Sequence, residues 1–258
     1  MRIRVLGAHN CETRSTRLVT LLLDDILALD AGGLTSTLTV KAQKKLKGIL
    51  LTHPHYDHIR DIPALGMNAL LHEFTVSVYS TQAVYDVLAT HLLNGKVYAE
   101  FLKKPEGNPV IKFNIVEPLK KVTIDGYDVL PVPVVHSVPA VGYEVTSPDG
   151  KKIFYAGDTG PGLAECWQHI APQVIFMETT APDHYTDFAR KALHLTPSLL
   201  KPELVAFKKQ KGYLPQVVLV HMNPNPDQKN PLAKQVAALA AELKTSISLA
   251  YEGMRIVV

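Results

Sequence analysis

The stretch Thr52-His53-Pro54-His55-Tyr56-Asp57-His58 places three histidines and one aspartate within six positions. It directly follows the apolar run at residues 48–51, which is typical of a strand that ends at a loop. Imidazole and carboxylate groups gathered in one loop suit zinc, manganese or iron. The alternative is a polar loop whose histidines cap the following helix. We predict a metal-binding loop at the end of a strand.

The composition is that of an ordinary globular protein. The chain has 258 residues, of which 47% are hydrophobic and 20% charged, so it can bury a large core. A net charge of +3 is too small to indicate a nucleic acid or an anionic membrane as partner. Cys11 and Cys166 form no paired motif, so we expect a reducing compartment. The N-terminus has no apolar signal segment and no run is long enough for a membrane span, so we expect a cytoplasmic protein.

Strand and helix signals alternate along the chain and predict an α/β fold. Helical signals lie at residues 37–47, 59–71, 82–93, 198–210 and 231–244. Runs typical of strands lie at residues 2–7, 18–23, 26–29, 48–51, 76–79, 110–136, 141–145, 152–156, 174–177, 217–220, 247–250 and 254–258. The irregular residues 94–109 predict an exposed loop or lid. Because the β-rich pattern occurs on both sides of the middle, we expect two sheets packed face to face with helices outside. Residues 1–258 are expected to form one domain.

Three further candidates follow predicted strands. His136, Asp158 and His221 each come directly after an apolar, β-rich run. A single histidine at a strand end is more often an ordinary polar residue than a ligand. Together with the histidine loop, however, these residues are numerous enough for two metal ions if one carboxylate bridges them. A two-metal site can hold a hydroxide and stabilise an in-line displacement.

At these positions the chain resembles a known family. The run His53-Pro54-His55-Tyr56-Asp57-His58, then His136, then Gly157-Asp158-Thr159-Gly160 and His221 are similar to the metallo-β-lactamase superfamily. The resemblance implies a four-layer αββα sandwich with two divalent ions, preferably zinc, with manganese or iron as alternatives. It implies a first site of His53, His55 and His136, a second of Asp57, His58 and His221, and Asp158 bridging both. Neither cysteine falls at a ligand position, which argues against antibiotic hydrolysis.

The C-terminal half is similar to the phosphodiesterase branch of this superfamily. Glu178-Thr179-Thr180 and the run His194-Leu195-Thr196-Pro197 resemble segments of class II cyclic-nucleotide phosphodiesterases, as does His91-Leu92-Leu93-Asn94-Gly95-Lys96. The ending Ala250-Tyr251-Glu252-Gly253-Met254 is similar to that of ribonuclease Z. Asp61 is a departure, because class II enzymes usually have glycine at that position.

The spacing of these motifs narrows the activities that the resemblance implies. Ribonuclease Z carries a long basic arm between the elements that match His136 and Asp158. Here residues 137–157 have room only for a hairpin. Residues 159–220 likewise cannot hold the large inserted domain of other nucleic-acid-processing members. A small substrate is therefore favoured over a long nucleic acid.

The resemblance also implies roles for individual residues. Asp57 would bind metal and orient the attacking hydroxide, while His194, oriented by Glu178, would protonate the leaving oxygen. The alternative for His194 is a structural place at the start of a helix. Asp30 is expected to support the metal loop through hydrogen bonds, or else to serve only in a turn. Candidate substrate contacts, with plain loop roles as alternatives, are Thr196, Asn223 and His184.

These inferences predict a binuclear metal-dependent hydrolase of a small phosphodiester. The expected substrate is a 3′,5′-cyclic nucleotide such as cyclic AMP or cyclic GMP. Alternatives are a carboxylic ester, thioester or lactone hydrolase, a ribonuclease Z-like RNA phosphodiesterase, and a metal-binding protein without activity. Glu178 and His194 favour phosphorus chemistry. We expect a small-molecule partner and no membrane, and a homodimer is left open.

Overall fold

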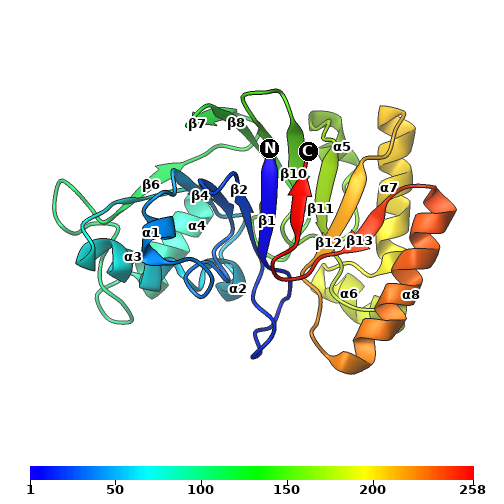
Figure 1. Cartoon of the computed structure of the whole chain (residues 1–258), viewed down its shortest axis with the longest axis horizontal. Helices are drawn as coiled ribbons and strands as arrows, with labels where there is room; N and C mark the ends of the chain where they lie inside the picture. The colour runs from blue at the N-terminus through cyan, green and yellow to red at the C-terminus, as the bar shows by residue number, and fades with distance from the viewer.

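The computed structural model describes residues 1–258 and shows two seven-stranded sheets that face each other (Figure 1). The first sheet consists, from edge to edge, of β14 (Arg255–Val257), β1 (Arg2–Gly7), β2 (Thr20–Leu23), β3 (Leu27–Leu29), β4 (Gly48–Leu50), β5 (Val76–Ser80) and β6 (Ile111–Ile115). The second consists of β13 (Ile247–Leu249), β12 (Gln216–Val220), β11 (Val174–Glu178), β10 (Lys152–Tyr155), β9 (Val141–Thr146), β8 (Tyr127–Pro133) and β7 (Val122–Ile124). Both sheets mix parallel and antiparallel pairs.

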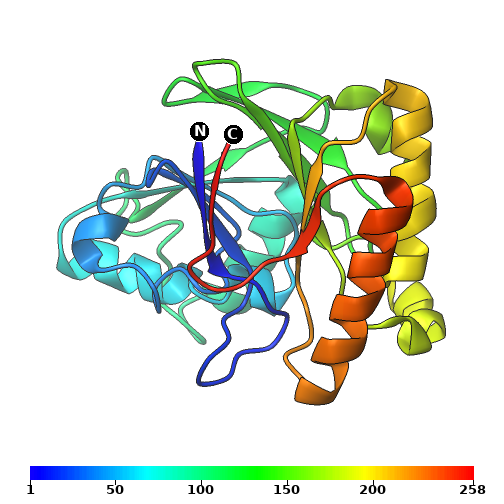
Figure 2. The ribbon, with the colours of Figure 1, turned by 45° about the vertical axis from the view of Figure 1, so that its right-hand side comes forward.

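Helices cover the outer face of each sheet. Those associated with the first sheet are α1 (Val40–Gln43), α2 (Tyr56–Ile59), α3 (Ile62–Leu71), α4 (Gln82–Val87) and the π-helical turn η1 (Leu88–Leu92). Those associated with the second are α5 (Ala164–His169), the 3-10 turn η2 (Asp183–Tyr185), α6 (Thr186–Ala192), α7 (Pro197–Lys211) and α8 (Pro226–Leu243). Figure 2 shows α7 and α8 side by side along the outside of the second sheet. The predicted αββα sandwich is confirmed.

The larger apolar core contains 45 buried residues from both sheets and from helices α5, α7 and α8. Leu21 of β2, Val129 of β8 and Phe154 of β10 are all fully buried in it. Burying each such side chain contributes about 1.5–3 kcal/mol. A second cluster of 20 residues lies between the first sheet and its helices. That residues 1–258 form one domain stays a prediction.

Several predicted elements differ in extent from those observed. The helix predicted at residues 37–47 is only the single turn α1, which Thr39 caps by accepting from the amide of Ala42. The four lysines at residues 41–47 place like charges three and four positions apart, which opposes a longer helix. Helix α8 begins five residues before the predicted start, because Asn225 caps it and Pro226 occupies its first position. Helices α5 and α6 were not predicted.

The predicted exposed loop at residues 94–109 is indeed irregular and largely exposed. Phe101 is its buried anchor and packs onto Gly66 of α3. A Cβ atom at Gly66 would lie 2.4 Å from the Phe101 ring, so only glycine fits there. The role of this loop as a lid stays a prediction.

The two ends of the chain meet in the first sheet, where β14 pairs antiparallel with β1 (Figure 1). The turn before β14 carries Glu252, whose Oε1 accepts from the backbone amides of Ala8 and Arg17 and from Nδ1 of His9. The segment that resembles ribonuclease Z thereby holds the loop at residues 8–17 in place. None of the helices combines the length and the apolar composition that a bilayer crossing requires.

Tyr127 links the two sheets and yields a prediction for stability. Its hydroxyl donates to Oδ2 of Asp24 at 2.5 Å, across from β8 to the turn between β2 and β3. Burial opposes the charge of Asp24, but the hydrogen bonds from Tyr127 and the Arg2 amide outweigh it and lower the pKa of Asp24. We expect Tyr127→Phe to lower the free energy of unfolding by about 1 kcal/mol at pH 7.

The loss in Tyr127→Phe should depend on pH. Because the folded pKa of Asp24 is depressed, its stabilisation is present above the unfolded value near 3.8 and disappears as the pH falls through the folded value. The gap between wild type and variant should therefore shrink in acid. Urea denaturation at pH 7 and at pH 3 measures it, and an equal gap at both pH values would contradict the assignment.

Candidate metal centre

The candidate ligands lie where strands of both sheets end. His53 and His55 follow β4, and Asp57 and His58 lie on the one-turn helix α2, not in a loop as predicted. The other three ligands come from the second sheet, after β8, β10 and β12; they are His136, Asp158 and His221. Strand ends that meet at one edge of a layered α/β fold commonly position a site, because a rigid sheet supports each loop.

Two unusual backbone positions bring the loops together. Gly157 has φ +64°, and a Cβ atom there would lie 2.8 Å from the side chain of Thr52. Only glycine therefore lets the Asp158 loop approach the histidine loop so closely. His221 has φ +65°, a strained conformation for a residue with a side chain. Backbone bonds from Met222 to Ala8 and from Asn223 to Thr180 hold it there.

The seven residues form two clusters that share Asp158. The first contains His53, His55, His136 and Asp158, and the second contains Asp57, His58, Asp158 and His221. Within each cluster the atoms able to bind a metal lie within 4.8 Å of one another. Nδ1 of His55 lies 3.0 Å from Nε2 of His53 and 3.1 Å from Nε2 of His136, so three imidazole nitrogens converge on one point. This is the grouping that the family resemblance implies.

The residues present fit divalent ions. Nε2 of His58 and Oδ1 of Asp158 are both buried and lack a hydrogen-bond partner, although they lie only 3.3 Å apart. Buried polar atoms without a partner are costly in a native structure. A cation between them would satisfy both. The donor set of imidazole nitrogens and carboxylate oxygens suits zinc, manganese and iron, and does not select among them.

Two hydrogen-bond relays set which histidine nitrogen faces the clusters. Thr52 donates its hydroxyl to Asp30, so it accepts from Nδ1 of His53 at 2.9 Å. Thr180 likewise donates to Glu178 at 2.8 Å and accepts from Nδ1 of His221 at 3.0 Å. In both relays a carboxylate and a threonine place the histidine proton on Nδ1. Nε2 of each histidine is thereby left with a lone pair for a metal.

The pKa shifts agree with this arrangement. Burial lowers the pKa of His53, His55 and His136, which keeps these imidazoles neutral, as ligands must be. Burial opposes the charge of Asp158, but His221 and His58 outweigh it and hold the pKa of that carboxyl well below its usual range. Burial opposes a proton on His58, but Asp158, Asp30 and Asp57 raise its pKa. The same carboxylates would favour a metal cation at that point.

The sequence of the chain matches a known family over most of its length. A family model described as a beta-lactamase superfamily domain matches residues 25–222, the span that contains every candidate ligand. The chain belongs to the beta-lactamase superfamily. This is a superfamily of hydrolases, and its metallo-beta-lactamase fold implies divalent metal ions, which the His and Asp clusters could bind.

One curated relative aligns with about three quarters of the chain, and solved structures of similar fold align with all of it. Ribonuclease Z of Methanocaldococcus jannaschii is 26% identical over 199 residues, which is 74% of this chain and 61% of the length of that enzyme. The structure of unliganded yeast PDE1 is 18% identical with a TM-score of 0.83, covering 100% of this chain and 99% of that one. The short form of human tRNase Z is 16% identical with a TM-score of 0.70, covering 100% and 99%.

Asp30 supports the histidine loop of this beta-lactamase superfamily member, as predicted. It is fully buried and accepts from the amide and hydroxyl of Thr52, from Nδ1 of His58 at 2.7 Å, and from the hydroxyl of Tyr155 at 2.6 Å. These hydrogen bonds fix the orientation of His58 and of Thr52, the residue that precedes His53. The sequence contained no signal for Tyr155, because it approaches from the opposite sheet.

We expect Asp30→Asn to weaken metal binding by about 10- to 100-fold, as loss of hydrogen bonds behind metal ligands typically does. An asparagine has one acceptor oxygen and cannot serve all four donors. Competition with a chromogenic chelator measures the affinity, and the exposed Asp25→Asn serves as matched control. Unchanged affinity in Asp30→Asn would show that Asp30 has only a turn role.

A buried carboxylate holds His194 beside the clusters. Glu178 is fully buried, and its oxygens accept from Nδ1 of His194 at 2.7 Å, the amides of Thr159 and Leu195, and the hydroxyl of Thr180. Glu178 and His194 also form a third group of possible ligands with Asp158 and His221, but four donors already occupy the oxygens of Glu178 and leave it no free position for a metal. The ring of His194 lies 5.2 Å from those of His136 and His221, one from each cluster. Burial opposes a proton on His194, but Glu178 raises its pKa to about 9.

The predicted substrate contacts have different surroundings. Thr196 is fully buried, and its hydroxyl pairs with those of Thr186 and Ser198, which fits packing between α6 and α7. Asn223 is half-buried and accepts from the amide of Asn225. His184 is exposed, stacks on Tyr185 and belongs to neither cluster. Substrate contact by these three residues stays a prediction.

Asp61 and His91 lie outside the two clusters. Asp61 is buried and accepts from the amide of Thr35 and from Nε of Arg60. The residue that departs from the class II pattern is therefore a buried aspartate whose side chain binds Thr35 and Arg60 and makes no capping hydrogen bond to α3. His91 is exposed on η1, so the resemblance around it does not bring a further histidine to the clusters.

Proposed function

We propose that this chain is a binuclear metal-dependent phosphodiesterase that hydrolyses a small phosphodiester, with a 3′,5′-cyclic nucleotide as the expected substrate. The observation that carries the proposal is the Glu178–His194 pair beside the two clusters. Hydrolysis of a phosphodiester expels an alkoxide, which needs a proton. A histidine held by a buried carboxylate next to the metal ligands is suited to deliver one.

The side chains of the site would have different roles in the reaction. Divalent ions held by the two clusters would supply Lewis acidity, which acidifies water and offsets the charge of the phosphate. Asp57 is partly exposed and its Oδ2 lies 3.3–3.4 Å from Nε2 of His58 and His221, so it can both bind metal and orient a water. His194 would give a proton to the leaving oxygen, while Glu178 holds its ring in place.

The comparisons support phosphorus chemistry without choosing a substrate. Ribonuclease Z, yeast PDE1 and human tRNase Z are similar to this chain. An RNA substrate is the second candidate, on the strength of the ribonuclease Z match. Against it, the segment between His136 and Asp158 contains only the β9–β10 hairpin and no extended arm.

A substrate screen tests the proposal. Zinc- and manganese-loaded protein should hydrolyse bis-p-nitrophenyl phosphate, and should then be tested on cyclic AMP, cyclic GMP, 2′,3′-cyclic nucleotides, a linear dinucleotide and a precursor tRNA. A lactone, a thioester and a carboxylic ester form the parallel series. Activity confined to the carboxylic compounds would replace the proposal with the ester hydrolase alternative. Metal-loaded protein inert on every compound would favour the binding-protein alternative.

A further inference from the structure

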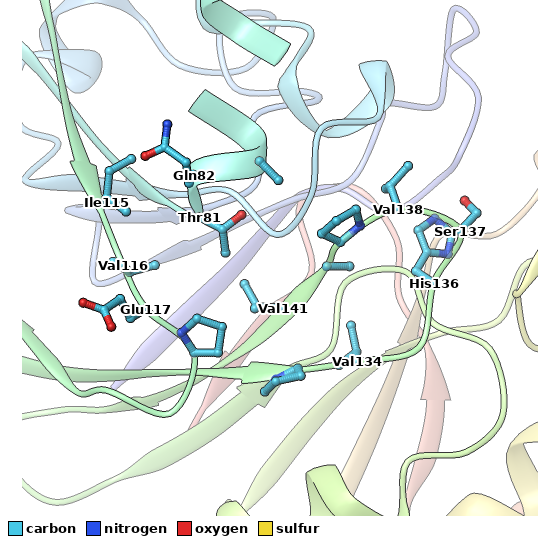
Figure 3. Close-up of a pocket in the computed structure, with 15 residues that line it drawn as sticks. Thr81, Gln82, Ile115, Val116, Glu117, Val134, His136, Ser137, Val138 and Val141 are labelled. Carbon is cyan, nitrogen blue, oxygen red and sulfur yellow. The ribbon is translucent and has the colours of Figure 1, made fainter. Parts of the chain in front are cut away.

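A cavity of about 690 Å³ lies beside His136. Its walls come from the start of α4, the end of β6 and the segment that joins β8 to β9 (Figure 3). Figure 3 shows His136 at one end of the cavity and Glu117 at the other, with the side chains of Thr81 and Val141 between them. Cavities of about 300–1,000 Å³ are typical of small-molecule sites.

The cavity lies next to the first metal cluster, because His136 borders the cavity while its fully buried imidazole belongs to the cluster. Nε2 of His136 lies 3.1 Å from Nδ1 of His55, while the residues that follow it, 137–141, form one wall of the cavity. The wall is held by backbone bonds from Val141 to Thr52 and from Val134 to Ala140. The cavity is thus the neighbouring space that could receive one ester group of a phosphodiester bound at the clusters.

The lining indicates what kind of group fits. Of its fifteen residues none is lysine or arginine, and apart from His136 the one ionisable side chain is Glu117. The remainder is largely aliphatic or proline. Exposed hydrogen-bonding capacity comes from Ser137 and from Gln82, whose amide nitrogen bonds Asp86, while the hydroxyl of Thr81 is buried and has no partner. Such a wall suits an uncharged group with a few polar atoms and disfavours a second phosphate.

We propose that this cavity binds the neutral, nucleoside-sized group esterified to the scissile phosphate, and so selects substrates that carry a single phosphodiester. The inference rests on the proposed phosphodiesterase function. It assigns a binding site to the ester group of the substrate, which the metal clusters do not contact. It also gives a physical reason for preferring a mononucleotide over RNA, because further phosphates would meet an acidic, cation-free wall.

Two p-nitrophenyl phosphodiesters with the same leaving group test the proposal. One carries a methyl ester and the other a thymidine 5′-ester. We expect wild type to favour the thymidine compound in kcat/KM by about tenfold or more, since burial of a large group in an apolar site discriminates strongly. Ala83→Trp and Ile115→Trp, which fill the cavity from two elements, should remove most of this preference and leave the methyl ester unchanged.

Lys112→Trp is the matched control, because it adds the same bulk to an exposed position of β6 that does not line the cavity. Adding a 3′-phosphate to the thymidine ester should lower kcat/KM of wild type, and Glu117→Lys should reverse much of that loss. Equal rates on the two esters in wild type, or equal losses on both in the filling variants, would overturn the inference and leave the phosphodiesterase function intact. Cleavage of neither ester would overturn that function, and the inference with it.

Discussion

His194→Ala should lower kcat for a cyclic nucleotide by about 10²- to 10⁴-fold, the contribution typical of a positioned general acid. Its metal content should equal that of wild type, because His194 lies outside the two clusters that the family resemblance implies, and Glu178, its neighbour in the third group, is occupied by four donors. The physical reason is the poor leaving group. An alkoxide leaves slowly without a proton, and Glu178 holds the His194 ring 5.2 Å from the rings of His136 and His221.

The leaving group distinguishes this role from a general loss of structure. p-Nitrophenolate needs little protonation, so His194→Ala should lose much less activity on bis-p-nitrophenyl phosphate than on the cyclic nucleotide. His184→Ala, which removes an exposed histidine outside the clusters, is the matched control. Equal losses on both substrates would contradict the acid role. Loss of metal from His194→Ala would instead assign this histidine as a ligand.

Asp158→Ala should remove metal from both sites at once and abolish detectable turnover. Asp158 is the carboxylate that the two clusters share, and it is almost completely buried. Its Oδ2 lies 3.2 Å from Nε2 of His221 and 3.8 Å from Nε2 of His53, and its Oδ1 lies 3.3 Å from Nε2 of His58. Without it, five histidines and Asp57 would surround the ions, and no carboxylate would be shared between the two sites.

Elemental analysis of purified protein measures this effect. We expect wild type to hold about two divalent ions per chain and Asp158→Ala to hold fewer than one, in line with the general two-metal arrangement. Asp187→Ala, an exposed aspartate outside the clusters, should retain the wild-type content. Circular dichroism checks that the variant is folded. A folded Asp158→Ala with a full complement of metal would show that Asp158 does not bridge the sites.

Local sequence patterns identified most strands and the candidate ligands. Apolar runs such as residues 217–220 are buried on both faces in a layered fold, and a polar residue directly after one, such as His221, is conspicuous. The histidine loop after β4 is detectable for the same reason. The short helix α2 was not predicted. It has a single turn, and its side chains Asp57 and His58 point to the clusters, so its sequence shows no amphipathic pattern.

Local sequence patterns did not predict contacts between segments that are distant along the chain. Strand β14 returns to pair with β1, although its sequence neighbours β12 and β13 belong to the other sheet. The threonines of the two relays, Thr52 and Thr180, look like ordinary β-rich or loop residues. Their role depends on which carboxylate the fold brings within hydrogen-bond distance.

The sequence by itself determined the family, the αββα layering and the chemical type of the site, because each rests on residue types and their spacing along the chain. Only the tertiary structure decided which carboxylate completes each relay, which nitrogen each relay leaves free, and where the cavity beside His136 lies. Those features depend on distances between strand ends and loops of both sheets. Such distances are set by the packing of the shared core, which no single stretch of sequence encodes.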